Sequence, residues 1–220
     1  MIIAIDGPAG AGKSTIARMT AQKLGFLYID TGAIYRALTL KVLENKIDIN
    51  DTASIVATAA STAINLVNNP DGSLKVLLDG IDVSQAIRQP RITRFVSDIA
   101  KIQKVREVLI KLQRELGLQR DSVLDGRDIG TVVFPDADKK FYLDARFEER
   151  VMRRYKELKA LGENVTYEDI AKDLRNRDTI DSTRQCAPLK KADDAAYVDT
   201  TEMSIEAVVE AVLKKIRKTG

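Results

Sequence analysis

The 220-residue sequence contains no histidine and only one cysteine, Cys186. Without histidine, Ser–His and Cys–His nucleophilic catalysis and imidazole metal sites are excluded. A single cysteine allows no intrachain disulfide and no four-cysteine zinc site, and it suits a reducing cytosol. Any catalysis must therefore use carboxylates, lysine, arginine, hydroxyls, backbone amides and a hard metal ion. Phosphoryl transfer fits that inventory, because it depends on positioning and charge neutralisation.

Long apolar runs are also lacking: none approaches the ~20 residues that a membrane helix needs. The stretch from Met1 to Asp6 is too short and too soon interrupted by charge for a signal peptide. The 35 basic and 32 acidic residues leave a net charge of +3, too balanced for a general nucleic-acid binder. We expect a soluble, cytoplasmic protein with no membrane or nucleic-acid-polymer partner.

The most specific motif is GPAGAGKS, residues 7–14, a full match to GxxxxGK[ST]. It lies between an apolar strand at 2–5 and a helix at 13–24, the context in which this motif forms a phosphate-binding loop. Its glycines let backbone N–H groups point at phosphate, at the positive end of the helix. Lys13 is expected to reach the β- and γ-phosphates and Ser14 to ligate Mg²⁺. The predicted ATP-binding residues are Gly7, Pro8, Ala9, Gly10, Ala11, Gly12, Lys13, Ser14 and Thr15.

The order of elements predicts an α/β fold with a parallel sheet flanked by helices. Strands are expected at 2–5, 26–29, 122–124, 140–143 and 196–198, and helices at 13–24, 30–45, 91–117, 146–160, 167–178 and 204–217. Residues 46–88 interrupt this order. A helix at 51–64 and two Asp-Gly hairpin signals predict a small antiparallel sheet over 65–84. We therefore expect a P-loop core of residues 1–45 and 89–220 with an insert at 46–88.

Two other classes of P-loop protein fit less well. Residues 45–48 read NKID, like the guanine-reading NKxD of GTPases, but they follow the first helical hairpin and not a late buried strand. No aspartate is followed three residues later by glycine, so the GTPase switch element is missing. A motor ATPase would need coupling modules for which 220 residues leave no room. A small kinase remains.

Arginines support a kinase with a second phosphate site. They lie at expected strand ends and helix starts, at Arg36, Arg127, Arg177 and Arg184. The guanidinium fork binds phosphate through two donors and keeps its charge. Each arginine alone reads as a surface residue; four at such places favour an anion site. Arg127 is the clearest, because it follows a sheet strand at the edge where open α/β folds bind ligands.

Two aspartates flank Arg127. Asp125 ends an apolar strand in the manner of a Mg²⁺-holding carboxylate, and Asp128 could accept hydrogen bonds from a substrate amino group. Loop aspartates that cap local N–H groups are an equally good interpretation of both.

A basic segment follows, with Arg150, Arg153, Arg154 and Arg175 on two predicted helices. It can be read as two solvated helix faces with i,i+4 pairs. It can also be read as a lid at about 150–166, hinged at Gly162, whose arginines close over the transferring group. We favour the lid, because a kinase must exclude water from the phosphoryl group.

Taken together, several segments resemble the bacterial cytidylate kinases, a family of nucleoside-monophosphate kinases. They are GPAGAGKST, DTGAIYR (30–36), DGIDVSQAIR (79–88), LDGRDIGTVVFPDA (124–137) and RDTIDSTRQCAPL (177–189). The resemblance covers essentially the whole chain, including the insert with its three-stranded sheet. The first segment is shared by many P-loop proteins, whereas the last two are specific to this family.

The resemblance implies a role for each matching residue. Ser97, Arg106 and Asp128 would read the cytosine edge. The CMP phosphate would be held by Thr31, Tyr35, Arg36, Arg127 and Arg184. Arg177 and Asp181 would hold the sugar. Arg153 and Arg154 would belong to the lid and act with Lys13 and Arg127 in catalysis. Position 31 is serine in some members, and threonine keeps the hydroxyl.

The implied reaction is transfer of the ATP γ-phosphoryl group to CMP or dCMP by a monomer that uses Mg²⁺. No general base is needed, because a phosphate oxygen is already ionised at neutral pH. Two alternatives stay open: a P-loop kinase for another nucleotide or small molecule, and a non-catalytic ATP-binding module.

Overall fold

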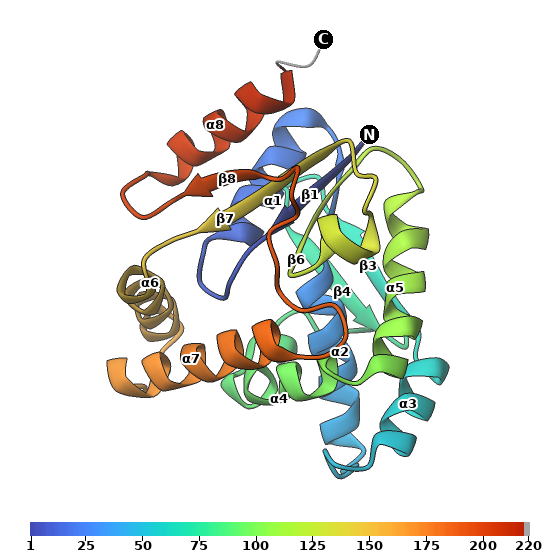
Figure 1. Ribbon diagram of the computed structural model, residues 1–220. Helices are drawn as coiled ribbons and strands as arrows, with labels where there is room; N and C mark the ends of the chain where they lie inside the picture. Colours follow the sequence, from blue (N-terminus) through green and yellow to red (C-terminus); the bar gives the residue numbers. More distant parts are fainter. Residues whose placement is uncertain (218–220) are drawn as a thin grey trace.

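The computed structural model describes residues 1–217 and contains a five-stranded parallel sheet (Figure 1). The strands follow the order β2-β6-β1-β7-β8. Their bounds are β1 (Ile2–Asp6), β2 (Leu27–Asp30), β6 (Ser122–Gly126), β7 (Lys139–Asp144) and β8 (Ala196–Asp199). The predicted parallel core is confirmed. Since all strands run one way, their carboxyl ends form one edge of the sheet, where open α/β folds bind ligands.

Alternating side chains give the sheet two buried faces. In β1, Ile3 and Ile5 pack on one side with α1 (Lys13–Leu24) and α8 (Ile205–Arg217). Ala4 points to the other side, which is covered by α2 (Thr31–Glu44) and α5 (Gln103–Gly117). Strands buried on both faces read as continuous apolar runs, as IIAI does here.

The second sheet is antiparallel, with the order β3-β4-β5, as the hairpin signals predicted. It consists of β3 (Ile64–Asn68), β4 (Leu74–Leu78) and β5 (Ile81–Asp82), preceded by α3 (Thr52–Ser61). Val76 and Leu78 pack in the same cluster as Leu38 of α2. The Asn68 side chain bonds both backbone groups of Tyr28, at 3.0 and 3.0 Å, and so fastens this sheet to the edge strand β2.

The helical segment predicted at 91–117 is two helices, which corrects the expectation of one. After the short η1 (Ala86–Arg88), α4 (Pro90–Ala100) ends and α5 begins at Gln103. Ile102 between them is extended, with φ −74° and ψ 113°. The break lets Arg106 fold back and donate to the Ala100 carbonyl at 3.2 Å. It therefore places a buried arginine beside the end of α4.

A helical hairpin of α6 (Phe147–Ala160) and α7 (Tyr167–Thr183) lies beside α4 (Figure 1). Its small apolar cluster joins Val151 and Leu174 to Ala9 of the glycine-rich loop. The helix predicted at 167–178 runs on to Thr183, so RDTIDST is helical. A short π-helix, η2 (Ile129–Val133), follows β6 and was not predicted. Among residues 1–217, no helix combines the length and apolar character needed to cross a membrane.

Candidate active site

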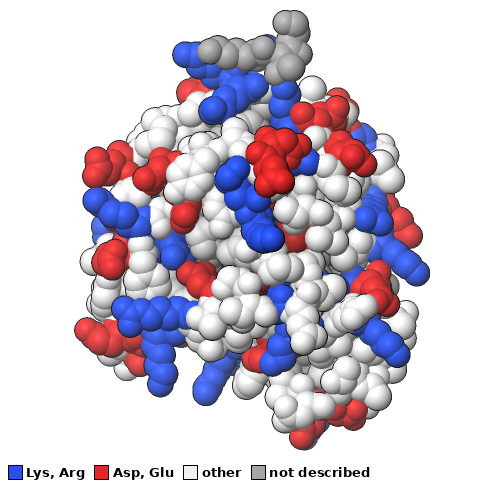
Figure 2. All heavy atoms as spheres, viewed as in Figure 1, with Lys and Arg blue, Asp and Glu red and all other residues white. Residues whose placement is uncertain are grey.

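A cavity of about 1240 Å³ opens at the carboxyl edge of the parallel sheet. Pockets for one drug-sized molecule are roughly 300–1,000 Å³, so this one has room for two nucleotides side by side. The predicted site residues that line it are Ala9, Gly10, Ala11, Gly12, Lys13, Ser14, Thr15, Thr31, Tyr35, Arg36, Ser97, Arg106, Asp125, Arg127, Asp128, Arg153, Arg154, Arg177, Asp181 and Arg184. Gly7 and Pro8 do not line the cavity. Basic and acidic side chains intersperse on the outer face seen in Figure 2, whereas arginines converge inside the cavity.

The glycine-rich loop depends on close approach and left-handed backbone at its glycines. A Cβ on Gly7, whose φ is 147°, would lie 1.9 Å from the Leu143 carbonyl oxygen. Gly12, the N-cap residue of α1, has φ 82°. Lys13 Nζ donates to the Pro8 carbonyl at 2.7 Å. Burial, reinforced by Arg127, lowers the pKa of Lys13 below its usual value. A bound polyphosphate would restore the full charge, because opposite charge favours the ammonium form.

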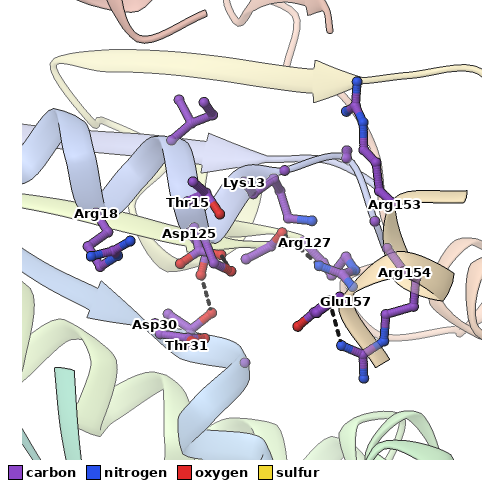
Figure 3. A pocket seen from close by; sticks show the side chains of 18 of the residues that line it. Lys13, Thr15, Arg18, Asp30, Thr31, Asp125, Arg127, Arg153, Arg154 and Glu157 are labelled. Atoms are coloured by element: carbon purple, nitrogen blue, oxygen red, sulfur yellow. Dashed lines mark hydrogen bonds and ion pairs between the residues drawn. The ribbon is translucent and has the colours of Figure 1, made fainter. Parts of the chain in front are cut away.

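Asp125 sits among oxygen donors at the centre of the cavity (Figure 3). Ser14 Oγ donates to its Oδ2 at 2.8 Å, and the Tyr28 hydroxyl donates to its Oδ1 at 2.9 Å. Burial and the nearby Asp30 raise the pKa of Asp125, because both disfavour the ionised carboxylate. Hydroxyl and carboxylate oxygens suit Mg²⁺. Within residues 1–217, no group of three or more acidic, cysteine or histidine side chains is arranged so that it could hold a metal ion.

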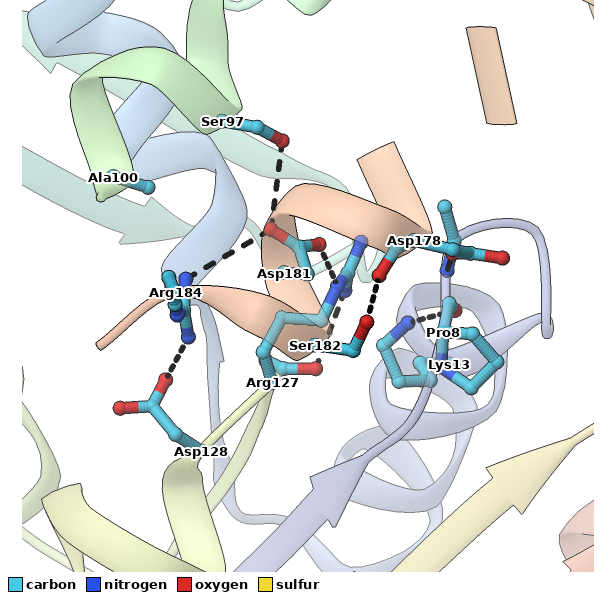
Figure 4. A network of polar contacts seen from close by, with 12 residues as sticks. Pro8, Lys13, Ser97, Ala100, Arg127, Asp128, Asp178, Asp181, Ser182 and Arg184 are labelled. Atoms are coloured by element: carbon cyan, nitrogen blue, oxygen red, sulfur yellow. Dashed lines mark hydrogen bonds and ion pairs between the residues drawn. The ribbon is translucent and has the colours of Figure 1, made fainter. Parts of the chain in front are cut away.

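Opposite the glycine-rich loop, buried arginines and aspartates form a continuous network (Figure 4). Asp128 is ion-paired to Arg106 and lies 3.4 Å from Arg184. Asp181 accepts from Arg127 Nε at 2.8 Å and lies 3.8 Å from Arg184. These charges satisfy one another within the protein. An incoming ligand must therefore replace some of these contacts with its own.

Two further arginines that line the cavity, Arg36 and Arg177, each keep one nitrogen without a partner within residues 1–217, although Arg36 pairs with Asp30 at 2.9 Å through another. Burial, reinforced by Arg127, lowers the pKa of Arg177 to about 10. The Nε atoms of Arg36 and Arg177 are buried without a hydrogen-bond partner among the described residues. Buried donors are nearly always paired in folded proteins. Unpaired guanidinium nitrogens at a cavity are therefore suited to phosphate. Burial raises the pKa of Asp181, but Arg127 and Arg184 outweigh it and keep that pKa low.

Helix α7 explains how three network residues come together. Arg177 and Asp181 are one turn apart, and Arg184 caps the helix end with its side chain folded back toward the same side. Ser97 of α4 reaches Asp181 at 3.4 Å. The spacing i, i+4, i+7 was visible in the sequence, and a longer helix prediction would have placed these residues on one face.

The arginines of α6 divide into two groups. Arg153 donates to the Thr200 carbonyl at 2.6 Å, and Arg154 pairs with Glu157 at 2.8 Å; both line the cavity (Figure 3). Arg150 does not line it. Its guanidinium is buried, pairs with Asp178 at 2.6 Å and donates to the Ala9 carbonyl at 2.9 Å.

The Arg150–Asp178 pair therefore binds both backbone groups of Ala9 in the glycine-rich loop, since Asp178 also accepts the Ala9 N–H at 3.3 Å. Sequence reasoning had grouped Arg150 with the lid arginines, and the structure corrects this. Arg175 is also turned away, with its guanidinium 4.9 Å from the Phe147 ring centre.

Sequence reasoning missed Tyr28, Asp178 and Asp6. Asp6 is buried at the end of β1, directly before the glycine-rich loop, and accepts backbone N–H groups from residues 129 and 130. Like Asp125 on the neighbouring strand, Asp6 is an aspartate at the end of an apolar run. This sequence pattern could have identified Asp6 as a candidate residue. The contacts of Tyr28 and Asp178 depend on tertiary packing.

Comparison with known proteins places the whole chain in one group. Residues 3–218 match the profile of the family described as cytidylate kinase. A cytidylate kinase from Caldanaerobacter subterraneus subsp. tengcongensis is 51% identical, over 98% of this chain and 94% of that relative. One from Clostridioides difficile is 48% identical over 98% of each chain. The crystal structure of an uncharacterized protein from Eubacterium ventriosum, 10% identical, superposes with a TM-score of 0.53 over 99% and 98% of the chains, a likeness of fold alone.

Proposed function

Because this chain belongs to the cytidylate kinase family, we propose that it transfers the γ-phosphoryl group of ATP to CMP or dCMP, giving ADP and CDP or dCDP. The observation that carries this proposal is the two-sided cavity. A glycine-rich loop forms one wall, and an arginine–aspartate network with Asp128 at its end forms the other. We further propose that the protein works in the cytoplasm, as a monomer, in pyrimidine nucleotide metabolism.

On the donor side, the backbone of residues 7–15 binds the ATP phosphates and Lys13 neutralises the β- and γ-oxygens. Ser14 and Asp125 would hold Mg²⁺, which when bound neutralises charge on the nucleotide. Lys13 is already oriented by the Pro8 carbonyl. The negative charge of an approaching phosphate raises the lowered pKa of Lys13 again, so the ammonium group is fully charged next to the γ-phosphoryl group.

On the acceptor side, Asp128 would read the base. Cytosine carries an N4 amino donor beside the N3 and O2 acceptors. A carboxylate that accepts from N4, with Arg106 and Ser97 as donors, is the complementary set. Uracil replaces the amino donor with a carbonyl, which would face the Asp128 carboxylate as a second acceptor. We therefore expect UMP to be a poor substrate.

The acceptor phosphate is bound between the two walls. Its ligands in this proposal are Thr31, Tyr35, Arg36, Arg127 and Arg184, while Arg177 and Asp181 hold the sugar. The unpaired Nε atoms of Arg36 and Arg177 support an anion here. The ionised α-phosphate oxygen attacks in line, so no general base is required. Arg127, Arg153 and Arg154 would spread the developing charge once the site closes.

Closure is assigned to two segments. We propose that residues 150–166 form a lid, with Gly162 at φ 81° in its turn, and that residues 46–88 form the nucleoside-monophosphate insert. In the structure Arg153 and Arg154 pair with Glu149 and Glu157. Lid closure would exchange these exposed contacts for phosphate, which excludes water from the transferring group.

A coupled ADP-release assay with CMP, dCMP, UMP and AMP tests this proposal. Turnover is expected with CMP and dCMP, and little with UMP or AMP. A preference for UMP or AMP would instead indicate a kinase for another monophosphate. ATP binding by calorimetry with no phosphorylation of any acceptor would indicate a non-catalytic nucleotide-binding module.

A further inference from the structure

Asp6 lies buried at the carboxyl end of β1, beneath the edge of the sheet where the cavity opens, and the proposed reaction leaves it without a role. Its side chain is 4% exposed, at the end of β1 and next to the first glycine of the loop. Each carboxylate oxygen accepts one backbone N–H: Oδ1 from Ile129 at 2.8 Å and Oδ2 from Gly130 at 2.8 Å. These two residues directly follow Asp128. The Asp6 carboxylate thus links β1, which leads into the glycine-rich loop, to the segment that follows Asp128, the residue that we propose reads the acceptor base.

The segment held by Asp6 buries Ile129 and Val133 in the core, and Arg114 donates to the carbonyls of residues 132 and 133. It forms the five-residue π-helix η2, in which the Asp128 carbonyl accepts from both Val132 and Val133, at 2.9 and 3.1 Å. The first N–H groups of a helix have no partner within it. Asp6 supplies that partner from another strand. The direction in which the chain leaves Asp128 therefore depends on the Asp6 carboxylate.

We propose that Asp6 is a positioning residue for the acceptor nucleotide, holding the loop after β6 so that Asp128 faces the base. The inference rests on the proposed phosphorylation of CMP. It predicts that a change at Asp6 raises the KM for CMP more than the KM for ATP, although Asp6 lies next to the glycine-rich loop in the sequence. Replacing a residue with a purely structural role would change both constants alike.

The electrostatics agree with a functional reason for the carboxylate. Burial raises the pKa of Asp6 to about 7, against the lowering effect of its two N–H donors. Asp128 raises the pKa further and Lys13 lowers it, while Tyr142 of β7 and the stem of Lys140 lie on the neighbouring strand. An ionised group held at such a pKa reduces stability at neutral pH. A costly buried charge is typical of functional sites.

The test compares Asp6→Asn with Asp138→Asn. Asp138 accepts the Ile2 N–H at 2.6 Å at the opposite end of β1, so it is a matched carboxylate-to-backbone contact away from the cavity. Asn at position 6 keeps one acceptor oxygen and loses the other. We expect the KM for CMP to rise about 10-fold or more while the KM for ATP stays within about 2-fold, from the usual cost of one hydrogen bond to a charged group. Asp138→Asn should change neither.

Two further measurements do not depend on the size of this kinetic effect. Hydrogen exchange of either the Ile129 or the Gly130 amide should become at least about 10-fold faster in Asp6→Asn than in wild type, because one of the two amides loses its acceptor. The ratio of kcat/KM for CMP to that for UMP should fall in wild type as pH drops through about 7, and should be flat in Asp6→Asn. Phosphate ionisation is common to both substrates and cancels in the ratio.

If Asp6→Asn does not fold, Gly130→Ala probes the same contact from the other side. A Cβ there would lie 3.1 Å from the Lys140 side chain and 3.4 Å from Asp6 Oδ2. A several-fold rise in the KM for CMP alone is expected. The proposal is overturned if CMP and ATP constants rise together, or if neither changes in either variant. If wild type phosphorylates no CMP, the proposed function fails, and the hydrogen-exchange result alone decides whether Asp6 holds the loop.

Discussion

The two walls of the cavity are built from different parts of the chain. The donor wall is largely backbone: residues 7–14 curl between β1 and α1, and one side chain, Lys13, completes it. The acceptor wall is almost entirely side chain. Its buried charges come from α5, α7 and the loop after β6, and they pair with one another through Asp128 and Asp181.

This difference explains what each wall can recognise. Backbone N–H groups offer phosphate the same donors whatever the sequence between the glycines, so the donor wall is shared by many phosphate-binding proteins. Paired side chains can be specific, because a ligand that fails to replace each contact leaves a buried charge unpaired. Selectivity for the base should therefore reside in the acceptor wall.

The largest expected effect separates catalysis from acceptor binding. Lys13→Ala should lower kcat by about 10³-fold or more, because the charge that neutralises the transferring group is lost. CMP binding measured by calorimetry should change by less than about 3-fold. The matched control is Lys23→Ala on the same helix, whose ammonium pairs with Glu210 at the surface. Loss of CMP binding in Lys13→Ala would show that the walls are not independent.

An intermediate effect is expected at Asp128. Asp128→Ala leaves Arg106, 1% exposed, without its partner, and breaking a buried pair costs about 3–5 kcal/mol. We expect kcat/KM for CMP to fall by about 10²-fold or more, with the KM for ATP nearly unchanged. The discrimination against UMP should fall as well.

Asp128→Asn is the matched comparison, since its amide oxygen still accepts from the cytosine amino group. Its loss should be smaller than that of Asp128→Ala. Unchanged selectivity between CMP and UMP in Asp128→Ala would remove this residue from the base site.

The difference between a wall built from local backbone and a wall built from distant side chains also decides how much of the structure the sequence could predict. The strand–loop–helix order and the glycine-rich motif are local patterns, and they predicted the parallel core and the donor loop in advance. The hairpin signals Asp71-Gly72 and Asp79-Gly80 likewise predicted the antiparallel sheet. The break at Ile102 carries no glycine or proline, so periodicity alone read 91–117 as one helix.

Contacts between distant segments were beyond such patterns. Arg150 looked like its neighbours Arg153 and Arg154, but only packing shows that it turns inward to Asp178 and Ala9. Asp6 reaches residues 129 and 130 across the sheet, and nothing near it in sequence reveals them. The roles of Ser97 and Arg106 were available only through resemblance to a family.

The smallest expected effect tests the boundary between the walls, at Tyr28. Its hydroxyl donates to Asp125 Oδ1 at 2.9 Å, while Ser14 donates to Oδ2. Burial and Asp125 raise the pKa of Tyr28 well above its usual value, so the hydroxyl remains a donor. Partners of this kind orient the carboxylates that hold metal ions.

Tyr28→Phe removes that one bond and keeps the ring. We expect ADP binding in the presence of Mg²⁺ to weaken by about 2- to 10-fold, from the usual worth of one hydrogen bond, and binding with chelator to be unchanged. Tyr197→Phe is the control, because its hydroxyl lies 3.4 Å from Asp144 on a 53% exposed side chain. Equal weakening with and without Mg²⁺ would mean that Tyr28 supports the fold of β2 and not the orientation of Asp125 that we propose for metal binding.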